Sequence, residues 1–121
     1  MSMGAVIYVR HVGVMTAFYS DLLGASQGAS GEGGEWAELD IDGDRLWIHL
    51  AGSEWRGERD GSTPVEFREQ NPVKLVFSLP AESVIEARVR ELGGFVIERP
   101  WGIDFCDPEG NVFSVQSGTS G

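Results

Sequence analysis

The chain has 121 residues, of which 41% are hydrophobic and 23% charged, and this composition predicts a single globular domain, residues 1–121, with a buried core. Its 9 basic and 19 acidic side chains give a net charge of −10. This charge argues against nucleic-acid and membrane-surface partners, because both require a basic patch. Two interpretations of the charge remain open, namely plain solubility and attraction of a cationic ligand.

Cys106 is the only cysteine, so no disulfide can form within the chain and no cysteine-based metal site can be assembled. The short apolar run Ala5–Val9 has no basic region before it and no cleavage-site pattern after it, which predicts a strand rather than a signal peptide. No stretch approaches the roughly 18 apolar residues of a membrane span. We therefore expect a cytoplasmic protein.

The first half, about residues 4–50, begins with a strand at Ala5–Arg10. A helix follows, because Met15, Phe18 and Leu22 recur at the spacing of one buried helical face, and Gly24 suits its C-terminal cap. Three further strands are predicted at Ala25–Ala29, Glu35–Ile41 and Arg45–Leu50. The last two are joined at Asp42-Gly43, which is a strong signal for a two-residue hairpin.

The second half, about residues 73–117, repeats this order of elements. Val73–Leu79 predicts a strand, and Ile85, Val89 and Leu92 mark the apolar face of a helix that ends at Gly93. Three more strands are predicted at Phe95–Glu98, Ile103–Cys106 and Asn111–Gln116. The connector, residues 51–72, is polar but carries Trp55, Val65 and Phe67. It predicts either a partly packed loop over a binding site or subunit, or a mobile loop.

Alternation gives each strand an aliphatic face, expected to pack on a helix, and a mixed face. In the first half the mixed face carries Trp36, Glu38, Asp40, Arg45, Trp47 and His49. Indoles and charges together are typical of a semi-enclosed small-molecule groove. The alternative is a solvated face on which Trp36 and Trp47 form a cross-strand pair.

Two motifs then carry a family resemblance. Residues 17–24 read AFYSDLLG and residues 105–113 read FCDPEGNVF. They resemble the "AFYxxxLG" helix end and the "F-x-DPxGN" turn of the vicinal-oxygen-chelate superfamily, which includes glyoxalases, bleomycin resistance proteins and extradiol dioxygenases. The resemblance covers nearly the whole chain. It implies an α+β fold of two tandem βαβββ modules that form a cup-shaped mixed sheet with helices on its outer face. It also implies a homodimer with a ligand cavity inside the cup.

Metal-dependent members of this superfamily carry four ligands on the first and fourth strands of the two modules. The resemblance assigns these positions to Gly4, His49, Lys74 and Ser114. Only His49 coordinates a metal well, and an ammonium such as that of Lys74 has no lone pair to offer. We therefore expect no divalent metal and no other cofactor. His11 lies after the first strand and is expected at the surface, where the helix begins.

Metal-free members, the bleomycin-type resistance proteins, sequester cationic aromatic drugs unchanged. The resemblance therefore implies metal-independent binding of a small molecule such as an antibiotic. The expected ligand-binding residues are Trp36, Glu38, Asp40, Arg45, Trp47, His49, Lys74, Trp101, Phe105 and Ser114. Trp55 and Phe67 are expected to close the cavity, and core or interface packing is the alternative for each tryptophan.

Two other functions remain open. The first is a glyoxalase-like lyase, an isomerase or a dioxygenase, with His49 as the candidate catalytic base and Lys74 or Arg45 stabilising an oxyanion. The second is a protein-interaction module whose sheet face binds a partner protein, because a fold does not fix a function.

Overall fold

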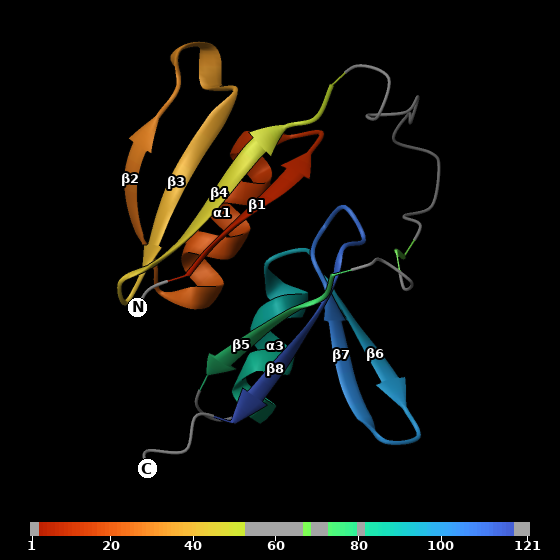
Figure 1. The fold of residues 1–121 in the computed structure, drawn as a ribbon. Helices are drawn as coiled ribbons and strands as arrows, with labels where there is room; N and C mark the ends of the chain where they lie inside the picture. The colour runs from red at the N-terminus through yellow and green to blue at the C-terminus, as the bar shows by residue number, and fades with distance from the viewer. Residues whose placement is uncertain (1–2, 53–66, 69–72, 80–81, 118–121) are drawn as a thin grey trace. The chain divides into compact units, whose positions relative to one another are not determined.

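A computed structural model describes residues 3–52, 67–68, 73–79 and 82–117 of the chain. It divides into two compact units, residues 1–64 and residues 65–121. Each unit contains one α-helix and one four-stranded mixed sheet (Figure 1). The predicted α+β fold of two βαβββ modules is therefore confirmed, while the cup that both sheets would form together stays a prediction. In the described part of the chain, no helix combines the length and apolarity that a membrane span requires.

Unit 1 contains all the elements predicted for the first half. They are β1 (Gly4–Val9), α1 (Val12–Leu23), β2 (Ser26–Ser30), a short 3-10 turn η1 (Glu32–Gly34), β3 (Trp36–Ile41) and β4 (Asp44–Leu50). The strand order is β1-β4-β3-β2, with β1 parallel to β4 and the other neighbours antiparallel. Helix α1 packs on β3 and β4. The bounds of the strands differ by only one residue from those predicted.

Two glycine signals in unit 1 have the predicted effect. Gly24 caps α1 in the left-handed conformation, with φ of 62°, and its N–H donates to the Ser20 carbonyl. Asp42 and Gly43 both have positive φ, 51° and 95°, as a type I′ hairpin requires. The Gly43 N–H also donates to Oδ1 of Asp40 at 2.9 Å. The register between β3 and β4 follows from this turn.

Unit 2 repeats the arrangement. Its elements are β5 (Leu75–Leu79), α3 (Glu82–Glu91), β6 (Phe95–Arg99), β7 (Gly102–Cys106) and β8 (Val112–Ser117). The strand order is β5-β8-β7-β6, with β5 parallel to β8. Strand β5 begins two residues later than predicted, and the other three strands differ by one residue.

The turn between β7 and β8 is organised by Asp107, which is fully buried. Its Oδ1 accepts hydrogen bonds from the backbone N–H groups of Glu109 and Asn111, both at 3.0 Å. Its Oδ2 accepts one from Nδ2 of Asn111 at 2.8 Å. The "DPxGN" motif therefore has a structural explanation, because its aspartate satisfies the donors of its own turn.

Aliphatic side chains and aromatic rings form the core of each unit. In unit 1, Met15, Leu39 and Ile48 are fully buried between α1 and the sheet. In unit 2, the ring of Phe113 lies 5.8 Å from that of Phe105 in a stacked arrangement. The predicted division of the strands into aliphatic and mixed faces is thus confirmed. The aliphatic faces form the core with the helices, and the mixed faces point away from the helices.

Candidate functional site

The unit 1 mixed face consists of three directly opposed pairs on β3 and β4. These pairs are Trp36 with His49, Glu38 with Trp47, and Asp40 with Arg45. The six residues predicted to share a face are therefore brought together. Trp36 and Trp47 are not directly opposite each other, because each indole is paired with a different residue, and the solvated face stays the alternative.

Glu38 is the most constrained residue of this face. Nη1 of Arg45 lies 2.5 Å from its Oε1, and Nε1 of Trp47 donates to its Oε2 at 3.2 Å. A Cβ added at Gly28 on β2 would lie 2.9 Å from Oε1, so the absence of a side chain there makes room for the carboxylate. Because Arg45 compensates its charge, Glu38 fixes Trp47 rather than offering a free negative charge.

The indole of Trp47 lies across Gly4 of the neighbouring strand β1. A Cβ at Gly4 would lie 2.7 Å from Cζ3 of the indole, closer than any real contact allows. Trp47 as a whole is only partly buried. The sequence thus builds a fixed aromatic surface from a glycine, an indole and a carboxylate.

His49 has a defined tautomer in this arrangement. Its Nδ1 lies 2.8 Å from the carbonyl oxygen of Leu50, and because a carbonyl only accepts, Nδ1 carries the proton. In the neutral ring, Nε2 is then left with its lone pair and can accept a proton. The ring of Tyr8, on β1, lies 5.6 Å away at a tilt of 55°.

The mixed face of unit 2 contains a second polar centre, which we call the Asp104 cluster (Lys74, Arg99, Asp104 and Ser114). Oδ1 of Asp104 accepts hydrogen bonds from Nζ of Lys74 at 2.9 Å and from Oγ of Ser114 at 2.7 Å. Oδ2 accepts one from Nε of Arg99 at 3.3 Å. Burial raises the pKa of this carboxyl, but the three hydrogen bonds and the charge of Lys74 outweigh burial and hold its pKa below the ordinary value of 3.8.

The strand registers correct one assignment made from the sequence. Val6 pairs with Trp47 in unit 1, and Val76 pairs with Ser114 in unit 2. Val6 and Val76 are 70 residues apart, the same separation as Gly4 and Lys74. Trp47, and not His49, is therefore the counterpart of Ser114. His49 instead corresponds to Gln116, which pairs with Ser78.

The four corrected positions do not suit a divalent metal. Gly4 has no side chain, and an indole such as Trp47 offers no coordinating lone pair. The ammonium of Lys74 and the hydroxyl of Ser114 both donate to Asp104. Within the described residues, no group of three or more His, Cys, Asp or Glu side chains could hold a metal ion. No step of a mechanism is therefore assigned to a metal.

The remaining predicted site residues have separate outcomes. Phe105 was expected to line the ligand site, but it is fully buried and stacks on Phe113 in the core, because it points to the face opposite Asp104. Trp101 lies in the turn between β6 and β7 and is 80% exposed. Phe67, from the connector, contacts Phe95 within unit 2 at 5.1 Å between ring centroids. Trp55 lies outside the described residues.

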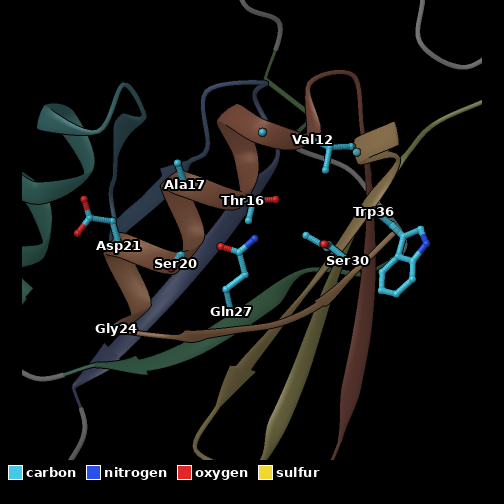
Figure 2. Close-up of a pocket in the computed structure, with 12 residues that line it drawn as sticks. Val12, Thr16, Ala17, Ser20, Asp21, Gly24, Gln27, Ser30 and Trp36 are labelled. Atoms are coloured by element: carbon cyan, nitrogen blue, oxygen red, sulfur yellow. The ribbon is translucent and has the colours of Figure 1, made fainter. Parts of the chain in front are cut away.

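A pocket of about 610 Å³ lies on the helix side of unit 1, where α1 leaves β2 uncovered. Figure 2 shows Thr16 and Gln27 pointing into the space between α1 and β2, while the indole of Trp36 points away from α1. Thr16 is 7% exposed, and its hydroxyl has no hydrogen-bond partner within the described residues. This pocket can take a small polar molecule or water, and Trp36 of β3 is among the residues that line it.

Several of these residues were not predicted. Side chains alternate along the strand 103–106, so Asp104 points to the other face of the sheet from Ile103 and Phe105. A carboxylate on the mixed face could therefore have been predicted from the sequence. Its partner Arg99 could not be found in this way, because it reaches Asp104 diagonally from another strand. Tyr8 and Thr16 belong to no sequence motif. Only the fold shows that Tyr8 lies next to His49 and that Thr16 lines the pocket of unit 1.

No protein-family model matches the chain, and no curated protein matches it in sequence. Solved structures do match its fold. A glyoxalase/bleomycin resistance protein/dioxygenase family enzyme from Burkholderia phytofirmans superposes with a TM-score of 0.65 and 17% identity, over 93% of this chain and 94% of that chain. An integron cassette protein from Vibrio cholerae gives a TM-score of 0.61 and 21% identity, over 98% and 94% of the two chains.

A third similar structure is a mutant of the fosfomycin resistance protein FosX from Listeria monocytogenes, in complex with Mn(II) and a dihydroxypropylphosphonic acid. Its TM-score is 0.66 at 20% identity, over 98% of this chain and 89% of that chain. At such identities the likeness establishes the fold alone. The resemblance inferred from the two motifs is thereby confirmed at the level of the fold.

Proposed function

We propose that this protein is a metal-independent small-molecule binding protein whose ligand carries an aromatic ring. The observation that carries the proposal is the fixed indole of Trp47, which lies across Gly4 and donates to Glu38. It is the counterpart of Ser114, at which the resemblance places a metal ligand in metal-dependent members of the superfamily. An aromatic surface thus stands where those proteins would hold an ion.

The geometry favours stacking because the indole is already held in place. A ring fixed by a hydrogen bond and by close packing loses little conformational entropy when a ligand binds. The ring of Tyr8, which is 60% exposed, and the imidazole of His49 extend the aromatic surface along the same face. Aromatic pairs of this kind contribute about 0.5–1.5 kcal/mol beyond the area that they bury.

The sequence predicted a cationic ligand, such as an antibiotic that is sequestered without chemical change. The net charge of −10 supports a cation through its long-range field. Glu38 adds no support, because Arg45 compensates its charge. Structural neighbours that are named for bleomycin and fosfomycin resistance support a drug-like ligand. The homodimer and the cytoplasmic location stay predictions.

Calorimetric titration of the full chain tests the proposal, with bleomycin and the aromatic cation N-methylquinolinium as probes. We expect saturable binding of at least one probe that survives chelator treatment and weakens roughly tenfold in Trp47→Leu. Val84→Ala, on an exposed position of α3, is the control and should bind as the wild type does. Absence of binding by both probes, or unchanged binding in Trp47→Leu, would contradict the proposal.

One observation favours a second function. The tautomer of His49 leaves Nε2 able to take a proton, as a metal-free general base must. The hemithioacetal of methylglyoxal and glutathione is a suitable substrate to test, in the presence of a chelator. Turnover that is lost in His49→Gln, with the same melting temperature, would support catalysis. Absence of turnover by the wild type would leave binding as the function.

A further inference from the structure

The pocket of unit 1 contains a buried hydroxyl that the fold itself does not use. Thr16 of α1 lines the pocket and is 7% exposed, and its Oγ1 has no hydrogen-bond partner within the described residues. Native proteins leave few buried polar groups without a partner, because each such group loses its bonds to water. A valine has the same shape and would fill this position without that loss. Packing alone therefore does not account for the hydroxyl.

The pocket has the size of a ligand site rather than that of a single water molecule. Its volume is about 610 Å³, whereas one water takes about 30 Å³ of the liquid and ligand pockets usually span about 300–1,000 Å³. Three of the lining residues are glycines, namely Gly13, Gly24 and Gly34, and a Cβ added at any of them would meet nothing within 4 Å. These parts of the wall are therefore not crowded by any described side chain.

A second hydrogen-bonding group reaches the same space from the sheet. Figure 2 shows Gln27 of β2 and Thr16 of α1 both pointing into the space between the two elements. Gln27 is exposed, so a ligand can reach its amide directly. A hydroxyl and a side-chain amide can each donate and accept a hydrogen bond. A molecule that satisfies both side chains therefore carries a donor as well as an acceptor.

The lining of the pocket carries little charge. In the part of the chain that the structure describes, Asp21 is the one charged residue that lines it, and Figure 2 shows its carboxylate directed away from Gln27. No described lysine or arginine lines the pocket, so an anion would lose its hydration there without gaining an ion pair. The lining therefore favours a neutral polar group over an anionic one.

We propose that this pocket binds a small neutral carboxamide, whose C=O and NH₂ groups form hydrogen bonds with the hydroxyl of Thr16 and the side-chain amide of Gln27. A carboxamide combines an acceptor and a donor without a charge, as the two side chains and the lining require. This site goes beyond the proposed function and does not rest on it, because Trp47 does not line the pocket. Strand alternation places Trp47 on the opposite face of β4 from the buried Leu46 and Ile48.

Titration of the ¹⁵N-labelled full chain by heteronuclear NMR tests the site, with cyclohexanecarboxamide and its anionic counterpart sodium cyclohexanecarboxylate as probes. Both probes lack an aromatic ring, so this result and the binding of aromatic probes at Trp47 can be told apart. We expect the carboxamide to cause saturable shifts of the backbone amides in residues 12–17 and 26–30, with the carboxylate binding more weakly. Thr16→Val should weaken binding of the carboxamide roughly fivefold, the effect of one lost hydrogen bond, and Thr16→Ser should retain it.

Val14→Thr is the matched control, because Val14 lies on the same helix, is 57% exposed and does not line the pocket. It should bind the carboxamide as the wild type does. The site would be overturned if the carboxamide gave no saturable shifts of these residues in the wild type, or if Thr16→Val bound it as tightly. Equal affinities for the two probes would overturn the preference for a neutral ligand, and unchanged affinity in Gln27→Leu would overturn the part assigned to Gln27. The wild-type titration decides the main point even if a variant fails to fold.

Discussion

Glu38 and Asp104 occupy equivalent positions in the two modules. Glu38 is directly opposite Trp47, and Asp104 lies beside Ser114, which is the counterpart of Trp47. Each carboxylate accepts a hydrogen bond from that neighbour and forms an ion pair with a cation on its own sheet. Arg45 pairs with Glu38, while Lys74 and Arg99 both pair with Asp104, so the same position holds an indole in unit 1 and a network of ion pairs in unit 2.

The first prediction concerns the contact between Gly4 and Trp47. Gly4→Ala places a methyl group 2.7 Å from Cζ3 of the indole, so the ring must move. We expect a changed tryptophan emission spectrum and several-fold weaker binding of an aromatic ligand. Gly13→Ala on α1 is the matched control, because an added Cβ there meets nothing within 4 Å. That control should be neutral or stabilising by up to about 1 kcal/mol.

A second prediction follows from the lowered pKa of Asp104. A carboxyl whose pKa is lower in the folded than in the unfolded protein stabilises the fold above the unfolded value of 3.8 and loses this effect as the pH falls through the folded value. Urea unfolding of the wild type and of Asp104→Asn should therefore show a large difference at pH 7. The difference should shrink steadily below pH 3.8. A difference that does not depend on pH would contradict the ion-pair assignment.

The hydroxyl of Thr16 gives a third prediction. It is buried without a partner in the described part of the chain, and such a group costs stability. Thr16→Val keeps the shape and the β-branching of the side chain, so we expect an unchanged or higher melting temperature. Thr16→Ser keeps the hydroxyl and removes a methyl group, and should be less stable. A loss of more than about 1 kcal/mol in Thr16→Val would mean that the hydroxyl has a partner, such as water in the pocket.

Metal addition gives a fourth prediction. Protein purified without chelator should contain no stoichiometric divalent ion, because neither the unit 1 positions, Gly4 and Trp47, nor the unit 2 positions, Lys74 and Ser114, offer side chains that suit one. Mn(II) or Zn(II) at about 1 mM should leave the melting temperature unchanged, whereas a site with a dissociation constant near 10 μM would stabilise the fold by about 2.7 kcal/mol. Elemental analysis and thermal unfolding check both parts. A stoichiometric ion would contradict metal independence and favour the glyoxalase-like lyase, isomerase or dioxygenase alternative.

Local signals in the sequence predicted the fold closely. The glycine at the end of α1, the Asp42-Gly43 hairpin and the alternation of the strands each depend on nearby residues, and each was confirmed. The site was harder to predict because it depends on register. The resemblance placed His49 at the position equivalent to Ser114, whereas the strand registers give Trp47, two residues earlier, as the counterpart of Ser114. The prediction that Phe105 binds a ligand was wrong for a related reason. It relied on the aromatic ring and did not use the strand alternation, which places Phe105 on the core face, opposite to Asp104.

The buried turn at Asp107 determines which way Asp104, three residues earlier in the chain, points. Side chains alternate along a strand, so a slip of one residue between β7 and β8 would turn Asp104 toward the core and Phe105 toward water. The hydrogen bonds that Asp107 accepts from the backbone of Glu109 and Asn111 fix the length of the turn and prevent this slip. The turn at Asp107 therefore fixes the register of β7 against β8, and this register decides that Asp104, rather than Phe105, lies on the mixed face of the sheet.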